Sequence, residues 1–206
     1  MKKLLLTLTL FTLSNLSAQF NVNLERINLL ATDQNNKDFF FKYISQQFDT
    51  NPNILDYYQL AVLYYQPINK LGSMKYNKIT DSAFNTFKQL DFKIFIETYE
   101  SYLKEMPANL TLLFLLSLVS NDEKSELYTK QLKQIINTLS YNKSFRNKEY
   151  LIELNSEADG LVLMKILGID YLSFNKIESF DGVNRIYTYT KENDEISFKI
   201  LNKTID

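Results

Sequence analysis

The sequence predicts an α+β protein, with helices in its first two thirds and a small sheet in its last third. Up to about residue 141, apolar residues recur at three- and four-residue spacing, which is the pattern of amphipathic helices packed on a core. After Asn142 they alternate with polar residues or form short aliphatic runs, which is the pattern of strands. Because helices and strands are segregated along the chain, we expect α+β rather than α/β.

The first residues are predicted to be a secretory signal peptide, residues 1–18. A positively charged start precedes an apolar run from Leu4 to Leu13, and small polar residues follow. This run is too short to cross a membrane as a helix, which takes roughly 20 residues. We place the cleavage after Ala18, so that Gln19 begins the mature chain. The alternative is an uncleaved amphipathic first helix.

The expected location is the periplasm or the cell exterior of a Gram-negative bacterium. The chain is rich in Lys, Asn, Ile and Tyr and poor in Arg, which is typical of an AT-rich bacterial genome. It contains no Cys, and exported proteins without disulfides are compatible with this location. We predict no integral membrane span after signal cleavage.

Two helices are predicted on either side of a turn at Pro52. They span about 38–48 and 55–66, and each carries an apolar stripe. We expect Pro67 to end the second helix and the segment up to Lys78 to form a loop.

Further helices are expected up to about residue 141. Thr80-Asp81, Asp91 and Asn121 are the residue types that cap helix N-termini. The run after Pro107 is almost entirely apolar, which indicates a buried core helix. The expected helices are 80–90, 91–103, 110–119 and 122–139.

The helical segments contain a weak internal repeat. Aligning Pro52 with Pro107 superimposes apolar positions, for example Leu60 with Leu115. A helix, a Pro-Asn turn and a second helix resemble the tetratricopeptide hairpin, although no third copy is present. The alternative is that any two antiparallel helical hairpins share this pattern.

The pattern of residues 149–203, with approximate bounds, predicts a small, mostly antiparallel sheet that carries one helix. Asp181-Gly182 is the strongest hairpin signal, whereas Asp159-Gly160 is interpreted only as turn chemistry. No linker-like segment separates this part from the helical part at about 36–141, so we expect one domain over 19–206. The expected strands are 150–154, 171–180, 183–190 and 195–201, and the expected helix is 156–167. The pattern does not determine which face of the sheet meets the helices.

Three segments carry a resemblance to a known family. They are Leu63-Tyr64-Tyr65, the aliphatic strand Tyr150 to Leu154, and the helix end Leu163 to Gly168. Together they resemble an uncharacterised family of secreted bacterial proteins of similar length, defined only as a domain of unknown function. The family tends to have Gly after the Tyr-Tyr pair, where this chain has Gln66. The resemblance implies secretion and a single domain, and it implies no catalytic residue or ligand.

The composition excludes many kinds of catalytic site. The chain has no His, Cys or Trp, which removes Ser-His-Asp and Cys-His catalysis and the common zinc sites. Its four Gly residues are scattered, so neither Gly-rich phosphate loop is present, and no calcium loop is recognisable. We predict no catalytic residue, no cofactor and no metal. Since the net charge is −1, nucleic acid is not an expected partner.

Carboxylates remain available for acid-base chemistry. Pairs such as Glu97 with Glu100, or Asp56 beside Tyr57, would allow glycan hydrolysis, but a solvent-exposed helix face has the same spacing. Ser140 and Lys143 fit the spacing of a Ser-Lys nucleophile without its companion motifs. Asp81-Ser82-Ala83 resembles a short O-glycosylation acceptor of exported bacterial proteins.

The aromatic residues are the unusual feature, with 14 Tyr and 15 Phe. Consecutive residues on a helix point about 100° apart, so adjacent aromatic residues cannot all face one core. Exposed tyrosines suit contact with an extended peptide or a sugar ring. We therefore predict ligand or partner contact at Tyr57, Tyr58, Tyr64 and Tyr65. The alternative is that these side chains pack between the helices and the sheet.

These observations favour a non-enzymatic binding or scaffold module of the cell envelope. Its expected partner is an envelope or secreted protein, or a glycan. The alternative is a carboxylate-dependent glycan hydrolase, and a chaperone or inhibitor of a neighbouring exported enzyme fits the same observations.

Overall fold

The computed structural model describes residues 22–87, 89, 91–141 and 151–204 of the 206-residue chain. The predicted signal peptide and its cleavage site at Ala18 and Gln19 lie outside the described residues. No helix in these ranges combines the length and the apolar character needed to span a membrane.

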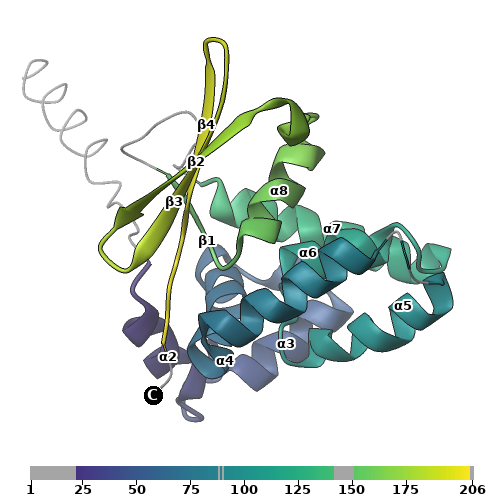
Figure 1. Ribbon diagram of the computed structural model, residues 1–206. Coiled ribbons are helices and arrows are strands. Elements are labelled where there is room, and N and C mark those ends of the chain that lie inside the picture. Colours follow the sequence, from purple (N-terminus) through teal and green to yellow (C-terminus); the bar gives the residue numbers. More distant parts are fainter. Residues whose placement is uncertain (1–21, 88, 90, 142–150, 205–206) are drawn as a thin grey trace, which may run out of the picture.

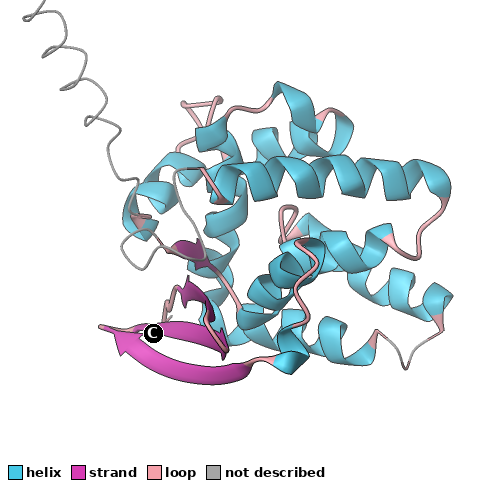
Figure 2. Cartoon of the chain, turned by 90° about the horizontal axis from the view of Figure 1, so that it is seen from above, coloured by secondary structure: helices cyan, strands magenta, loops and turns pink. Residues whose placement is uncertain are grey.

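The described chain confirms the α+β class. Helices form its N-terminal part, and a four-stranded sheet lies on one side of them (Figures 1 and 2). The α-helices are α2 (Leu24–Thr32), α3 (Phe41–Thr50), α4 (Tyr57–Thr86), α5 (Phe92–Tyr99), α6 (Leu110–Ser117), α7 (Asp122–Leu139) and α8 (Glu157–Ile166). Short 3-10 helices are η1 (Pro52–Ile54), η2 (Glu100–Lys104) and η3 (Tyr171–Ser173), and the strands are β1 (Ile152–Leu154), β2 (Asn175–Asp181), β3 (Asn184–Lys191) and β4 (Asp194–Ile200).

Polar N-caps set where most of these helices begin. The predicted caps Asp91 and Asn121 accept hydrogen bonds from the first turns of α5 and α7. Asp56 forms a reciprocal capping box with Gln59 at the start of α4. The first helix of the described chain, α2, has no counterpart among the predicted helices, although Asn23 caps it in the same way.

The predicted loop after Pro67 is wrong, because α4 continues through this segment to Thr86. The helix breaks at Gly72 instead, whose φ of 73° and ψ of 156° favour glycine. The N–H of the next residue, Ser73, donates to the carbonyl of Lys203 at 2.9 Å, and the Lys203 N–H donates back to Ser73 Oγ at 2.6 Å. The chain after β4 therefore satisfies backbone groups at the break.

The predicted helix start at Thr80-Asp81 is also wrong. Both residues lie inside α4, where the Thr80 hydroxyl donates to the carbonyl of Tyr76 at 3.1 Å. Ser82, in the predicted glycosylation motif, thus lies in mid-helix and hydrogen-bonds to the Tyr99 hydroxyl. A residue type that caps helices can also hydrogen-bond back to a carbonyl of its own helix, and the residue type alone does not distinguish these two roles.

The sheet has the strand order β1-β4-β3-β2. Strand β1 is parallel to β4, and the other pairs are antiparallel, which agrees with a mostly antiparallel sheet. Tyr187 pairs with Phe198 across β3 and β4, and both are buried together with Tyr189. This face of the sheet therefore faces the core.

Helix α8 packs closely on that face. A Cβ added to Gly160 would lie 2.2 Å from Cζ of Phe198, so only glycine allows this approach. The interpretation of Asp159-Gly160 as a turn is wrong, since both residues lie inside α8 and are buried. The Asp-Gly pair is explained here by packing.

The predicted hairpin at Asp181-Gly182 is present. Asp181 and Asn184 pair across β2 and β3, so Gly182 and Val183 form the two-residue turn. Gly182 has a φ of 61°, as expected for the first turn residue of a type II′ hairpin. Strand β2 begins at Asn175, later than predicted, because residues 171–173 form η3.

One buried hydrophobic cluster connects the helices with the sheet. It contains residues from Ile27 on α2 to Leu201 after β4. Helix α4 is central, since it contacts α2, α3, α6, α7 and α8. The tyrosines of α4 therefore lie either in the hydrophobic core or at the protein surface, depending on their position along the helix.

Candidate binding surface

Two of the four predicted contact residues, Tyr64 and Tyr65, lie in the core. Their rings meet edge to face at 4.8 Å, and both are almost fully buried. The Tyr65 hydroxyl donates to the carbonyl of Glu153 at 2.9 Å. The Tyr64 hydroxyl donates to Asp159 Oδ2 at 2.9 Å and accepts the N–H of Asn155 at 3.1 Å. Tyr64 and Tyr65 therefore follow the alternative interpretation of the sequence, in which these side chains pack between the helices and the sheet.

Asp159 is the centre of this buried polar group. Its Oδ1 accepts the N–H and the hydroxyl of Thr111, at 3.0 and 2.8 Å. Its Oδ2 accepts the hydroxyls of Tyr64 and, at 3.3 Å, Tyr76. Thr111 is in the first turn of α6 and Asp159 in the first turn of α8, so two helix N-termini favour a negative charge here.

Burial and hydrogen bonding act in opposite directions on Asp159. Burial raises the pKa of its carboxyl above the ordinary value of 3.8, while the hydrogen bonds from Thr111 and Tyr64 lower it, and burial dominates. Burial, together with the charge of Asp159, also raises the pKa of Tyr64 and Tyr76. The buried polar group joins α4, α6 and α8. Asp159 is 0 % exposed, so a ligand cannot reach it.

The other two predicted residues, Tyr57 and Tyr58, lie at the surface. The ring of Tyr57 meets that of Tyr58 edge to face at 5.3 Å and that of Tyr141 at 5.1 Å. Tyr58 is 55 % exposed and Tyr141 is 61 % exposed. We call these three residues the tyrosine surface. Sequence reasoning missed Tyr141, because it follows α7 and is far from Tyr57 in the chain.

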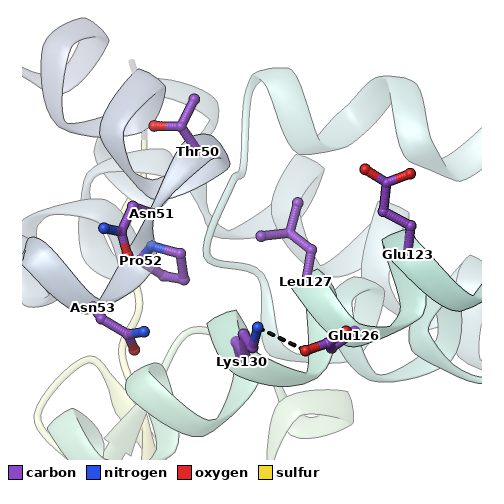
Figure 3. A pocket seen from close by; sticks show the side chains of 8 residues that line it. All are labelled: Thr50, Asn51, Pro52, Asn53, Glu123, Glu126, Leu127 and Lys130. Atoms are coloured by element: carbon purple, nitrogen blue, oxygen red, sulfur yellow. Dashed lines mark ion pairs between the residues drawn. The ribbon is translucent and has the colours of Figure 1, made fainter.

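A shallow depression lies between α7 and the residues around Pro52 (Figure 3). Its volume of about 210 Å³ is below the roughly 300–1,000 Å³ of typical small-molecule pockets. Leu127, Lys130 and Gln134 are spaced as one face of α7, and Tyr141 follows the end of this helix. Gln134 Nε2 donates to Asn53 Oδ1 at 2.8 Å. The depression is lined by Thr50, Asn51, Pro52, Asn53, Glu123, Glu126, Leu127 and Lys130, with an ion pair of 2.7 Å between Lys130 and Glu126.

Two of the carboxylates singled out from the sequence, Asp56 and Glu100, have structural contacts. Asp56 caps α4. Glu100 accepts hydrogen bonds from Lys124 and Tyr128, at 2.6 and 2.5 Å, while Glu97 is exposed. Ser140 caps the end of α7, and Lys143 of the Ser-Lys spacing lies outside the described residues.

A different pair of carboxylates, Asp81 on α4 and Glu157 at the start of α8, is coupled electrostatically. Burial raises the pKa of Asp81 on α4, and the charges of Glu157 and Asp159 raise it further. Glu157, at the start of α8, accepts Lys176 Nζ at 2.5 Å and the hydroxyl of Tyr189 at 2.8 Å. No local pattern in the sequence indicates this pair, because Asp81 and Glu157 come from separate parts of the chain. Within the described residues, no group of three or more Asp or Glu is placed to hold a metal ion.

No protein family, curated protein or solved structure matches this chain.

Proposed function

We propose that this protein is an exported, non-enzymatic binding module of the cell envelope, and that the tyrosine surface contacts its partner. The observation that carries the proposal is the contact of three aromatic rings at the surface, two of them more than half exposed. Tyrosine is enriched at protein interfaces because its ring is apolar and its hydroxyl forms hydrogen bonds.

The partner that fits this surface best is another exported protein. The depression between α7 and the residues around Pro52 is too small to enclose a typical small molecule. Buried tyrosines at interfaces act as anchors surrounded by polar contacts, and Asn53, Gln134 and Lys130 supply polar groups here. A glycan is the other ligand that stacks on tyrosine rings, and the experiment below separates the two.

Cross-linked affinity capture tests the proposal. The mature chain is expressed in the bacterium that makes it, captured after cross-linking, and the bound material is identified by mass spectrometry. We expect one stoichiometric envelope protein, and we expect its capture to fall at least tenfold in the double variant Tyr58→Ala, Tyr141→Ala. The matched control is Tyr43→Ala, since Tyr43 is an exposed tyrosine on α3.

Equal capture by the double variant and by Tyr43→Ala would contradict the role of the tyrosine surface. If the wild-type chain captures no protein but binds cell-wall glycan, the partner is a glycan and not a protein. The N-terminal residue of the captured chain tests export, and we expect Gln19.

A carboxylate-dependent glycan hydrolase is the second candidate, and the pair Asp81 and Glu157 supports it. Retaining and inverting glycosidases use one carboxyl that keeps its proton and one that is ionised. The raised pKa of Asp81 suits the acid, and Glu157, which contacts Lys176 Nζ at 2.5 Å, is the carboxylate whose charge acts on Asp81. Wild-type protein that releases reducing sugar from cell-wall or dietary polysaccharide, with loss of this activity in Asp81→Asn and Glu157→Gln, would favour the hydrolase over the binding module.

A further inference from the structure

Strand β2 is an exposed edge of the described sheet. It pairs with β3 on one side, and no described strand follows it on the other (Figure 1). Its seven residues are all exposed. Four large apolar side chains within and beside it are exposed by more than half, which is a concentration that soluble surfaces usually avoid. These side chains are Leu172, Ile177, Phe180 and Val183.

The hairpin determines which backbone groups of β2 point outward. The two-residue turn makes Asp181 and Asn184 the hydrogen-bonded pair that closes the hairpin. Because hydrogen-bonded and non-hydrogen-bonded positions alternate along an antiparallel pair, Lys176, Glu178 and Phe180 direct their N–H and C=O groups away from β3. These groups are positioned to pair with another strand.

We propose that β2 pairs with β2 of a second copy of this chain, antiparallel about a two-fold axis at Ile177. In this register Ile177 lies opposite the partner's Ile177. Lys176 lies opposite the partner's Glu178, and Glu178 lies opposite the partner's Lys176. Both Lys-Glu pairs fall at positions whose backbone groups point outward, so each pair exchanges two backbone hydrogen bonds.

Charge complementarity favours a second copy over an unrelated strand. Within one chain, Lys176 contacts Glu157 at 2.5 Å, and Glu178 contacts Arg185 at 3.7 Å. The side chains of Lys176 and Glu178 are still 40 % and 38 % exposed. Pairing two copies would place these charges in alternating order across the interface, twice by symmetry.

The exposed apolar side chains within β2 fit the same register. Phe180 lies opposite the partner's Phe174, which packs partly against the core of its own chain. Ile177 and Phe180, the two exposed apolar residues within β2, thus fall within one interface, which extends the four-stranded sheet to eight strands.

The dimer goes beyond the proposed function, because the β2 edge and the tyrosine surface use different residues. A two-fold dimer would present two tyrosine surfaces, so a partner attached to a surface could be bound with avidity. Failure of one proposal leaves the other intact.

A cysteine placed on the proposed axis tests the register directly, since the chain has no Cys of its own. Ile177→Cys places two thiols at a non-hydrogen-bonded pair, where Cα atoms are about 4.5 Å apart, within disulfide range. Ser179→Cys is the control on the same exposed strand face. Its two copies would lie about 13 Å apart, four residues out of register, and cannot form a disulfide.

We expect Ile177→Cys to form a covalent dimer under mild oxidation and Ser179→Cys to remain a monomer on a non-reducing gel. Equal cross-linking of both variants would overturn the register, and no cross-linking of either would overturn the dimer.

Charge reversal supplies a second measurement that does not use cysteine. Lys176→Glu and Glu178→Lys each place like charges opposite one another, and sedimentation should show dimerisation weakened on the order of tenfold. An equimolar mixture of the two variants restores both Lys-Glu pairs in a heterodimer. We expect the mixture to regain wild-type association. A wild-type chain that sediments as a monomer, or a mixture as weak as the single variants, would overturn the proposal in favour of a different occupant of this edge.

Discussion

Helix α4 carries two pairs of adjacent tyrosines at equivalent positions, and their surroundings are opposite. Tyr57-Tyr58 and Tyr64-Tyr65 are about two helical turns apart, so they occupy the same helix face. Yet Tyr58 is 55 % exposed, whereas Tyr65, seven residues later on the same face, is 4 % exposed. The first pair lies at the N-terminal end of the helix, while the second is covered by β1 and α8. Helix face alone therefore does not determine burial, which also depends on what packs at each level along the helix.

The largest expected effect is the loss of the buried carboxylate. Asp159→Ala leaves the hydroxyls of Tyr64 and Tyr76 and both donors of Thr111 without their acceptor. We expect the free energy of unfolding in urea to fall by about 3–5 kcal/mol. Asp170→Ala, at an exposed aspartate, should change it by less than about 0.5 kcal/mol. Similar losses of unfolding free energy in both variants would mean that the buried carboxylate of Asp159 contributes no more to stability than an exposed one.

A smaller effect is expected where α8 approaches the sheet. Gly160→Ala places a methyl group against the ring of Phe198, which is fully buried and cannot move without displacing β4. Thermal unfolding should show a loss of about 2–3 kcal/mol. The double variant Gly160→Ala, Phe198→Leu should recover part of it, since the smaller side chain relieves the clash. A neutral Gly160→Ala would mean that α8 is not held against the sheet.

Removing one hydroxyl from each tyrosine pair tests the difference between their surroundings. Tyr64→Phe loses the bonds to Asp159 and from Asn155, and we expect a loss of about 2 kcal/mol of unfolding free energy. Tyr58→Phe should cost less than about 0.5 kcal/mol, because the Tyr58 side chain is solvent-exposed. Equal losses in urea titrations would show that exposure does not separate the two pairs.

The pH dependence of stability has a predicted sign. Because the pKa of Asp159 is raised in the folded protein, its carboxyl keeps a proton that the unfolded chain loses above about 3.8. Its contribution to the unfolding free energy therefore falls as pH rises from 3.8 and levels off above the folded pKa. Asp159→Asn lacks this decline. We expect the free energy of unfolding of wild type minus that of Asp159→Asn to fall with pH, and a rising difference would mean that hydrogen bonding dominates over burial.

The sequence predicted the features that depend on local chemistry. Helix caps such as Asp91 and Asn121 act within one turn, and the hairpin at Gly182 depends on two turn residues. Both were therefore predicted from a few adjacent residues, together with the α+β class that follows from the apolar period.

The features that were mispredicted depend on distant parts of the chain. Helix α4 continues past Pro67 to a break at Gly72, where Lys203 supplies hydrogen-bonding groups from the other end of the chain. Gly160 is required by Phe198 rather than by a turn. Tyr141 joins the tyrosine surface because α7 returns alongside η1, and no sequence pattern links it to Tyr57.

The most direct test of the difference between the two tyrosine pairs combines stability with partner capture. Tyr58→Ala and Tyr64→Phe are compared with wild type by urea unfolding and by affinity capture, at a temperature where all three are folded. We predict that Tyr58→Ala keeps its stability and loses its partner, while Tyr64→Phe loses stability and keeps its partner. Undiminished capture by Tyr58→Ala, or loss of capture by folded Tyr64→Phe, would contradict the assignment of binding to the exposed pair.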